Sequence, residues 1–482
     1  MATGHDFVLI VTEDGNLCTS GDNLYGQLGI GDFEPHEQSC LLKYVDTFGG
    51  HEVVMVTAAK FQCACITKDG SLWTWGDNLH GVLGHPNEFP LRDRLQCRPR
   101  RLSSRLHGDS PVLMAAYGFD FLLILTISGH VWSFGVGLDY ELGHGSAEVT
   151  RVPKRIDPAV FDNAEIGMIA AGYHHCFALS KTGGRVWSWG SNDKGQTGVN
   201  NEFVDETTKC VHTPTLIPAA ALQGGLVVFV TCGCDISALV TVDGVVWMCG
   251  RKSQYGGTGL GDNIAGSHVF RRIGGAEFFG SGIRMVSCGV YHTMLLANDN
   301  TVWTSGRGEN GEMARGIITN IHGVPERRLP RQVDARFFLR SAPRALHDND
   351  VVVVAAGDHC SFAITYGGTL YFWGSGPRDY FVPVRRPHNL PIWASFEMPA
   401  PTLGLADNSA QYARAGRWHY IHQDAMIAFV MGTRPGFAVN TERPSNSTFP
   451  VEMLHELFQG MRFAPREQTS HGARALLGIE DD

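Results

Sequence analysis

Short segments of alternating apolar and polar residues, bounded by Gly, Asp or Asn, recur along the chain. The clearest example is residues 169–198, IAAGYHHCFALSKTGGRVWSWGSNDKGQTG. In this unit an apolar run ends at Gly172, an alternating strand follows His175, and a second alternating strand ends at Gly190. A period of two predicts half-buried strands, and the glycine-containing turn between them predicts a hairpin.

The glycine that ends the second strand marks further copies of this unit, spaced 55 to 68 residues apart. A second marker, at the position of Gly172, stands 16 to 18 residues upstream of it in every copy. Repeats of this period predict a propeller, solenoid or array. We expect the strand-ending glycines to adopt positive φ or to allow close backbone approach. These structural repeat glycines are Gly21, Gly76, Gly135, Gly190, Gly250, Gly306 and Gly374, with a weak eighth copy at Gly432.

The repeats divide the 482-residue chain into two parts. Residues 1–432 are expected to form one repeat domain, since the copies follow one another almost without interruption. Residues 433–482 leave the pattern and are expected to form a C-terminal tail. In that tail a short amphipathic helix is expected between Pro450 and Gly460, and a second one over residues 471–477.

Charge and cysteine content restrict the compartment and the chemistry. The net charge of −9 disfavours a general binder of nucleic acid or of acidic membranes. The first residues lack a basic signal-peptide region, and no apolar run approaches the ~20 residues of a membrane helix. We therefore expect an intracellular protein, cytoplasmic or nuclear and not secreted. The pairs Cys63–Cys65 and Cys232–Cys234 are spaced more closely than zinc ligands, so we expect buried thiols, no metal and no cofactor.

The repeat pattern, clearest at residues 21–29 (GDNLYGQLG) and 169–198, resembles the regulator of chromosome condensation (RCC-type) repeat family over about residues 1–432. The resemblance implies an all-β fold, a seven-bladed β-propeller of four-stranded blades. Candidate inner and outer strands number seven each, and almost no chain precedes Gly4. Residues 409–416 are therefore expected to supply the missing inner strand and to close the ring by joining the N- and C-terminal repeat segments. Eight blades is the alternative.

The two residues that follow the upstream marker lie on a loop found in every repeat and are expected to face one mouth of the central channel. In the family, residues of these loops contact a small GTPase and promote release of its nucleotide. The alternative is that they only form hydrogen bonds to neighbouring loops. The histidines one residue further, at 175, 292 and 419, are expected to be structural. The second loop residues form a candidate partner-binding ring of Asp6, Phe61, Asp120, His174, Asp235, Tyr291, His359 and Trp418.

No phosphate-binding loop, nucleophile elbow or zinc-protease motif is present, so we expect no catalytic residues. Three functions remain open. The first is a monomeric scaffold or adaptor that binds a protein partner at the channel mouth. The second is a guanine-nucleotide exchange factor for a small Ran-like GTPase. The third is a chromatin or nucleic-acid binder that uses the arginine-rich insertions at residues 86–110 and 315–344.

Overall fold

The fold is given by a computed structural model. It describes residues 2–4, 7–12, 15–34, 43–86, 95–181, 184–199, 204–251, 257–260, 267–275, 279–306, 312–313, 330–333, 350–357, 360–365, 370–374 and 426–428.

The described strands form antiparallel sheets in which neighbours in sequence are neighbours in space. The first sheet contains β1 (Ala2–Thr3), β2 (Phe7–Val11), β3 (Leu17–Gly21) and β4 (Lys43–Val45). The second contains β5 (Val53–Ala58), β6 (Gln62–Thr67), β7 (Leu72–Asp77) and β8 (Leu95–Arg101), with β28 (Met426–Ala428) paired to β5. The third contains β9 (Val112–Tyr117), β10 (Phe121–Thr126), β11 (Val131–Gly137) and β12 (Glu148–Arg155).

The remaining sheets repeat the same order. The fourth contains β13 (Ile166–Ala171), β14 (His175–Ser180), β15 (Val186–Ser191) and β16 (Cys210–Leu216). The fifth contains β17 (Val227–Cys232), β18 (Ile236–Thr241), β19 (Val246–Gly250) and β20 (Ser267–Gly274). The sixth contains β21 (Ile283–Cys288), β22 (His292–Ala297), β23 (Val302–Gly306) and β24 (Arg331–Gln332), and the last contains β25 (Val351–Ala356), β26 (Cys360–Thr365) and β27 (Leu370–Gly374). Short 3-10 helices follow three of the outer strands: η2 (Ser104–His107), η3 (Pro158–Phe161) and η5 (Ala219–Leu222).

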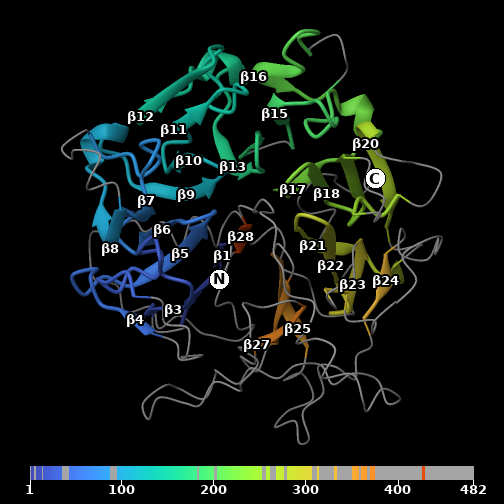
Figure 1. The fold of residues 1–482 in the computed structure, drawn as a ribbon. Coiled ribbons are helices and arrows are strands. Elements are labelled where there is room, and N and C mark those ends of the chain that lie inside the picture. Colours follow the sequence, from blue (N-terminus) through green and yellow to red (C-terminus); the bar gives the residue numbers. More distant parts are fainter. Residues whose placement is uncertain are drawn as a thin grey trace, which may run out of the picture.

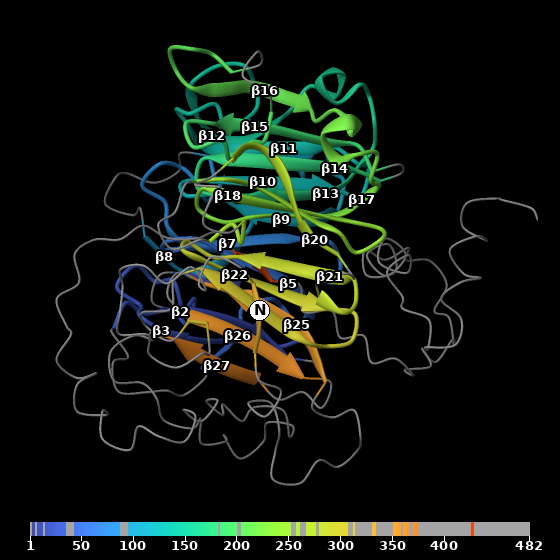
Figure 2. The same ribbon diagram turned by 90° about the vertical axis from the view of Figure 1, so that its right-hand side faces the viewer.

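The sheets are arranged around a common axis, so the protein is an all-β propeller of four-stranded blades (Figure 1). Strands such as β9, β13 and β17 lie nearest the axis, and β12, β16 and β20 lie at the rim (Figures 1 and 2). Six sheets have four or more described strands, and β25–β27 form the seventh with three. The seven-bladed ring therefore stays a prediction beyond the described residues.

The expected ring closure is not tested, because residues 409–416 lie outside the described ranges. The inner edge of the first sheet is nevertheless occupied, since β1 pairs with β2 through Ala2–Leu9 and Thr3–Val8. Almost no chain precedes Gly4, yet two residues, Ala2 and Thr3, are enough to make this short inner strand. Residues 433–482 and their expected helices also lie outside the described ranges. In the part of the chain that is described, no helix is long and apolar enough to cross a membrane.

Buried aromatic residues hold neighbouring blades together. Trp75, Trp187 and Trp189 are almost fully buried. The indole N–H of Trp75 donates to the carbonyl of Gln27 in the preceding blade at 2.9 Å, and that of Trp189 donates to the carbonyl of Glu141 at 2.7 Å. Trp75 and Trp189 each bury a large apolar surface and also satisfy a carbonyl in the preceding blade.

The first arginine-rich insertion is partly an ordinary blade element. Its residues 95–101 form β8, the outer strand of the second sheet, and residues 104–107 form η2. Arg101 lies 3.8 Å from the Asp69 carboxylate. Most of the second insertion, including Arg327 and Arg344, lies outside the described residues.

Candidate functional site

Five residues of the candidate ring are described, and each lies on the loop that joins an inner strand to the next strand of its blade. Asp6, His359 and Trp418 lie outside the described residues. The others are half-buried, in contrast to the buried strands on either side of them. The loop position thus gives each repeat one partly exposed side chain near the propeller axis. These residues are Phe61, Asp120, His174, Asp235 and Tyr291.

The repeat glycines allow the end of the third strand of each blade to pack closely against these loops. Six of them have φ between 97° and 121°, a conformation that glycine adopts readily and other residues rarely. A Cβ atom at Gly76 would lie 2.0 Å from the carbonyl oxygen of Phe61, and one at Gly190 would lie 2.5 Å from that of His174. The glycine therefore lets the strand end approach the loop that carries the ring residue.

The first loop residues form a second layer, which the sequence analysis did not single out. Tyr173, Cys234 and Val290 are buried together, with Phe119 packed against them. The loops also bond to one another, since the Phe119 N–H donates to the Tyr173 carbonyl at 3.0 Å. The Lys60 ammonium lies 5.0 Å from the centre of the Phe119 ring. The sequence does contain a signal for this layer, because the first loop residue is apolar in four successive repeats.

The two described acids of the ring lie in partly dehydrated positions. Burial raises the pKa of both Asp120 and Asp235 above the usual value of 3.8. Nearby positive charges oppose this rise in pKa: the Arg251 guanidinium lies 3.2 Å from the Asp235 carboxylate, and the charge of Lys60 lowers the pKa of Asp120. The side chain of Asp235 is 17% exposed. These acids are therefore held by internal charges while part of each remains accessible to a ligand.

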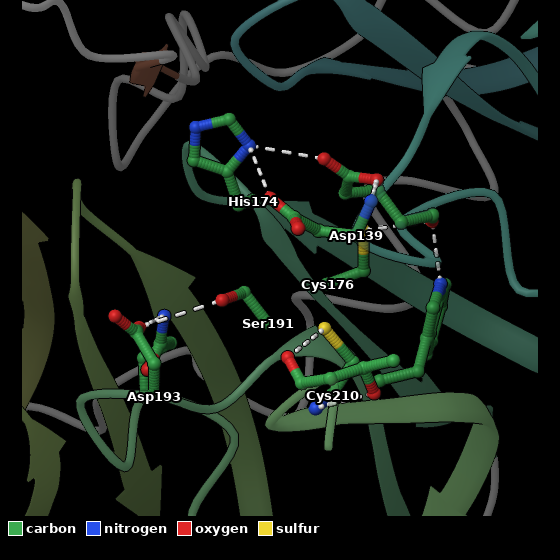
Figure 3. Close-up of polar contacts among 10 residues, drawn as sticks. Asp139, His174, Cys176, Ser191, Asp193 and Cys210 are labelled. Atoms are coloured by element: carbon green, nitrogen blue, oxygen red, sulfur yellow. Dashed lines mark hydrogen bonds and ion pairs between the residues drawn. The ribbon is translucent and has the colours of Figure 1, made fainter. Parts of the chain in front are cut away.

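His174 is the centre of a polar cluster between the third and fourth blades (Figure 3). Its Nδ1 lies 3.0 Å from Oε1 of Glu141 and 3.4 Å from Oδ2 of Asp139, both on the loop after β11. Burial alone would lower the pKa of His174, but the hydrogen bond and charge of Glu141, with Asp139 and Asp235, raise it above 6.5. Burial raises the pKa of Glu141, whose side chain is only 3% exposed.

Glu141 occupies a position at which other repeats carry Gln. The carboxamide oxygens of Gln27 and Gln196 accept from the backbone N–H two residues earlier, at 2.8 and 2.9 Å. Glu141 makes the same bond to the N–H of Asp139 at 2.8 Å. Its second oxygen cannot donate as a Gln amide does, and His174 supplies the donor instead. Sequence reasoning missed Asp139 and Glu141, although the change from Gln to Glu in this motif was visible.

The histidines that follow the ring residues lie inside the blades. His175 is fully buried, and its Nε2 lies 2.7 Å from the Ser237 hydroxyl of the next blade. His292 makes the equivalent contact with Ser361 at 2.9 Å. Burial lowers the pKa of His175 to about 3, so it is neutral at physiological pH. His419 lies outside the described residues.

The four cysteines of the two closely spaced pairs are buried thiols. Cys63, Cys65, Cys232 and Cys234 are free and buried in the described structure. Burial raises the pKa of Cys63, Cys65 and Cys232 well above 9. Thiolates are the reactive form, so these side chains serve as small apolar groups.

The described ring residues, by contrast, can bind a ligand through charge, aromatic contact and hydrogen bonding.

Comparisons with known proteins agree with this architecture. Residues 1–273 match the RCC1-like domain, and residues 283–312 match the regulator of chromosome condensation (RCC1) repeat. The crystal structure of human WBSCR16 superposes with a TM-score of 0.61 over 76% of this chain and 86% of that chain, at 22% identity. At that identity the likeness concerns the fold alone.

Several curated proteins are similar in sequence. The human E3 ubiquitin-protein ligase HERC2 is 34% identical over 48% of this chain and 4% of its own length. The ultraviolet-B receptor UVR8 of Arabidopsis thaliana is 31% identical over 55% of each chain. The guanine nucleotide exchange factor SRM1 of Saccharomyces cerevisiae is 25% identical over 68% of this chain and 54% of its own. The match thus spans a small part of HERC2 and little more than half of the other two.

The resemblance that the repeat motifs suggested is therefore confirmed. The family match covers more than half of the chain, the propeller has the expected four-stranded blades, and the second match continues the repeats. This chain belongs to the RCC1-like domain family.

Proposed function

We propose that this protein is a non-catalytic interaction propeller that binds a protein partner through the ring of loops around Asp120, His174 and Asp235. The observation that carries the proposal is the partial exposure of the five described ring residues, in contrast to their buried neighbours in the strands. Such a ring combines acids, an imidazole and aromatic groups on one rigid support. Aromatic and charged groups on a rigid support are typical of interface anchors.

The proposed partner carries basic groups at its contact surface. Asp120 and Asp235 have pKa values raised by burial, so a cation that replaces lost water would favour their charged forms. Asp235 already holds Arg251 at 3.2 Å, which shows that a guanidinium fits beside it. Exposed charge pairs are screened over about 8–10 Å, so binding is expected to weaken as the salt concentration rises.

A second candidate is guanine-nucleotide exchange on a small Ran-like GTPase. It is favoured by the similarity to SRM1, which is named as an exchange factor. Release of fluorescent GDP from a Ran-type GTPase, with and without this protein, tests it directly. An unchanged release rate at a high excess of the propeller would exclude exchange and would leave the adaptor proposal in place.

The binding proposal is tested with a double variant, Asp120→Ala with Asp235→Ala. We expect it to fold with an unchanged circular-dichroism spectrum and to lose the protein that the wild type captures from a cell lysate. The expected loss is about 2 kcal/mol or more of binding free energy per anchoring residue. The matched control, Glu148→Ala with Asp162→Ala, removes the same charge from exposed sites outside the loop ring. A folded double variant that retains full affinity would contradict the proposal.

The proposal includes the wider organisation of the chain. A propeller over residues 1–432, closed into seven blades, would present the loop ring, with residues 433–482 as a tail. We place the protein inside the cell, in the cytoplasm or nucleus, as a monomer. Fractionation of cells that express the tagged full chain tests the location, and light scattering tests the oligomeric state.

A further inference from the structure

We infer that Asp139, Glu141 and His174 form a binding site for a divalent transition-metal ion such as Zn²⁺, which would link the third and fourth blades. This site shares His174 with the proposed partner-binding ring, but it does not include Asp120 or Asp235, on which the partner-binding test depends. Asp139 and Glu141 come from the loop after β11, and His174 comes from the loop before β14. Figure 3 shows the His174 ring facing the Asp139 side chain. The three candidate donor atoms lie within 4.8 Å of one another.

The distances suit a metal ion. Zinc binds His nitrogen and carboxylate oxygen at about 2.0–2.2 Å, which places neighbouring donors about 3.3–3.6 Å apart in tetrahedral geometry and about 2.8–3.1 Å apart in octahedral geometry. Nδ1 of His174 lies 3.0 Å from Oε1 of Glu141 and 3.4 Å from Oδ2 of Asp139. Small side-chain rotations would therefore bring all three donors into a metal's first coordination sphere. A mixture of imidazole and carboxylate suits Zn²⁺ and similar ions better than Ca²⁺ or Mg²⁺.

The charges lead to the same conclusion. Two carboxylates face one imidazole, so the cluster carries a net charge of −1 even when His174 is protonated. Glu141 is 3% exposed, and the charged groups that act on it most strongly are His174 and Asp139. A divalent ion with a neutral His174 would bring the cluster to zero net charge. Burying such a carboxylate is costly unless a cation or hydrogen bonds compensate.

The ligands are also held in advance by their backbones. The Glu141 carbonyl accepts from Trp189 Nε1 at 2.7 Å and from Cys176 Sγ at 3.4 Å, both in the fourth blade. The carbonyl of His174 accepts from the Ser191 N–H at 2.7 Å. The side chains of His174 and Asp139 are 39% and 47% exposed, so an ion can enter and keep a water ligand. A site fixed by packed neighbours loses little entropy on binding.

The test is calorimetric titration of the full chain with ZnCl₂ at pH 7.5, after treatment with EDTA and dialysis. We expect one ion per chain, a melting temperature that rises with Zn²⁺, and weaker binding as the pH falls, because protons compete with the metal ion for its ligands. X-ray absorption at the zinc edge should show nitrogen and oxygen neighbours only. Sulfur neighbours near 2.3 Å would place the ion on the cysteines and overturn the assignment.

The decisive variant is Glu141→Gln, because Gln27 and Gln196 show that Gln fits this position of the repeat. It should fold normally and lose affinity for Zn²⁺ by at least about 10-fold. The control variant, Glu148→Gln, removes an equal charge from β12 and should bind as the wild type does. Equal binding by Glu141→Gln and the wild type, or no binding by the wild type, would overturn the site. Neither result would affect the partner-binding test, which depends on Asp120 and Asp235.

Discussion

The junction between the first and second blades and the junction between the third and fourth share the same main-chain contacts but differ in their side chains. In the first, the carbonyl of Gln27 accepts from Trp75 Nε1 at 2.9 Å and Cys63 Sγ at 3.2 Å. In the second, the carbonyl of Glu141 accepts from the equivalent Trp189 and Cys176 at 2.7 and 3.4 Å. The contacts that join the blades therefore come from the main chain of this loop.

The side chains of Gln27 and Glu141 have different partners at the two junctions. The Nε2 of Gln27 donates to Asp22 within its own loop at 2.9 Å, and the facing ring residue, Phe61, stacks on Tyr25 with ring centres 3.9 Å apart. At the other junction Glu141 cannot donate, and the facing ring residue is His174. Because the backbone carries the structural role, the side chains are free to vary. The carbonyl contact with Trp is common to the two junctions, whereas the contact between Glu141 and His174 belongs to the junction of the third and fourth blades.

The largest expected effect is on the shared backbone. Gly190→Ala and Gly76→Ala should each destabilise the protein by roughly 3 kcal/mol, since each adds backbone strain and a clash with a ring carbonyl. Gly224→Ala is the control, because its φ is also positive, at 80°, but no atom lies within 4 Å of the added Cβ. Thermal unfolding measures all three. Equal losses at Gly190 and Gly224 would mean that the loop contact adds nothing to the strain.

An intermediate effect should separate the side chains of the two junctions. Gln27→Glu places a carboxylate against Asp22, with no histidine to donate to it, and should cost about 1–3 kcal/mol. The reverse change, Glu141→Gln, restores the residue found in other repeats and should cost much less. Denaturant unfolding of both variants gives the comparison. Similar losses for the two changes would show that the junctions are not specialised in this way.

The smallest effect concerns pH. Phe121 pairs with the repeat glycine Gly135 in the third blade, and His175 pairs with the repeat glycine Gly190 in the fourth. His175 therefore occupies the position that Phe121 has in the third blade. Burial lowers the pKa of His175 to about 3, below the 6.5 expected in the unfolded chain, so between these values the unfolded state binds more protons. Stability should fall as the pH drops below 6.5, and this group should contribute a loss of about 1 kcal/mol between pH 6.5 and pH 5.5.

His175→Phe tests that contribution because it copies the third blade. The variant should lose the hydrogen bond to Ser237, and its melting temperature should change less between pH 7.5 and pH 5 than that of the wild type. Half-buried His144, whose pKa burial lowers to about 4, remains in both proteins and contributes to the background. An unchanged pH dependence would mean that His175 does not titrate across the unfolding transition.

The sequence by itself determined the repeat, the strands and the family. Alternation and glycine spacing depend on local backbone geometry, which is why residues such as Gly76 and Gly190 could be recognised one repeat at a time. The loop position of Asp120 and His174 followed from the same spacing. The repeat pattern does not determine whether these loop residues bind a partner, because binding depends on the side chains that pack around each of them in the folded protein.

Only the tertiary structure decided which side chains meet. Asp139 and Glu141 lie more than 30 residues from His174 in sequence, yet blade packing brings their donor atoms to within 3.4 Å of its Nδ1. The expectation of no metal rested on the cysteine pairs, such as Cys63 and Cys65, which are spaced more closely than zinc ligands. A site shared by two blades has no such spacing, since its geometry is set by the carbonyl contacts that dock one blade on the next.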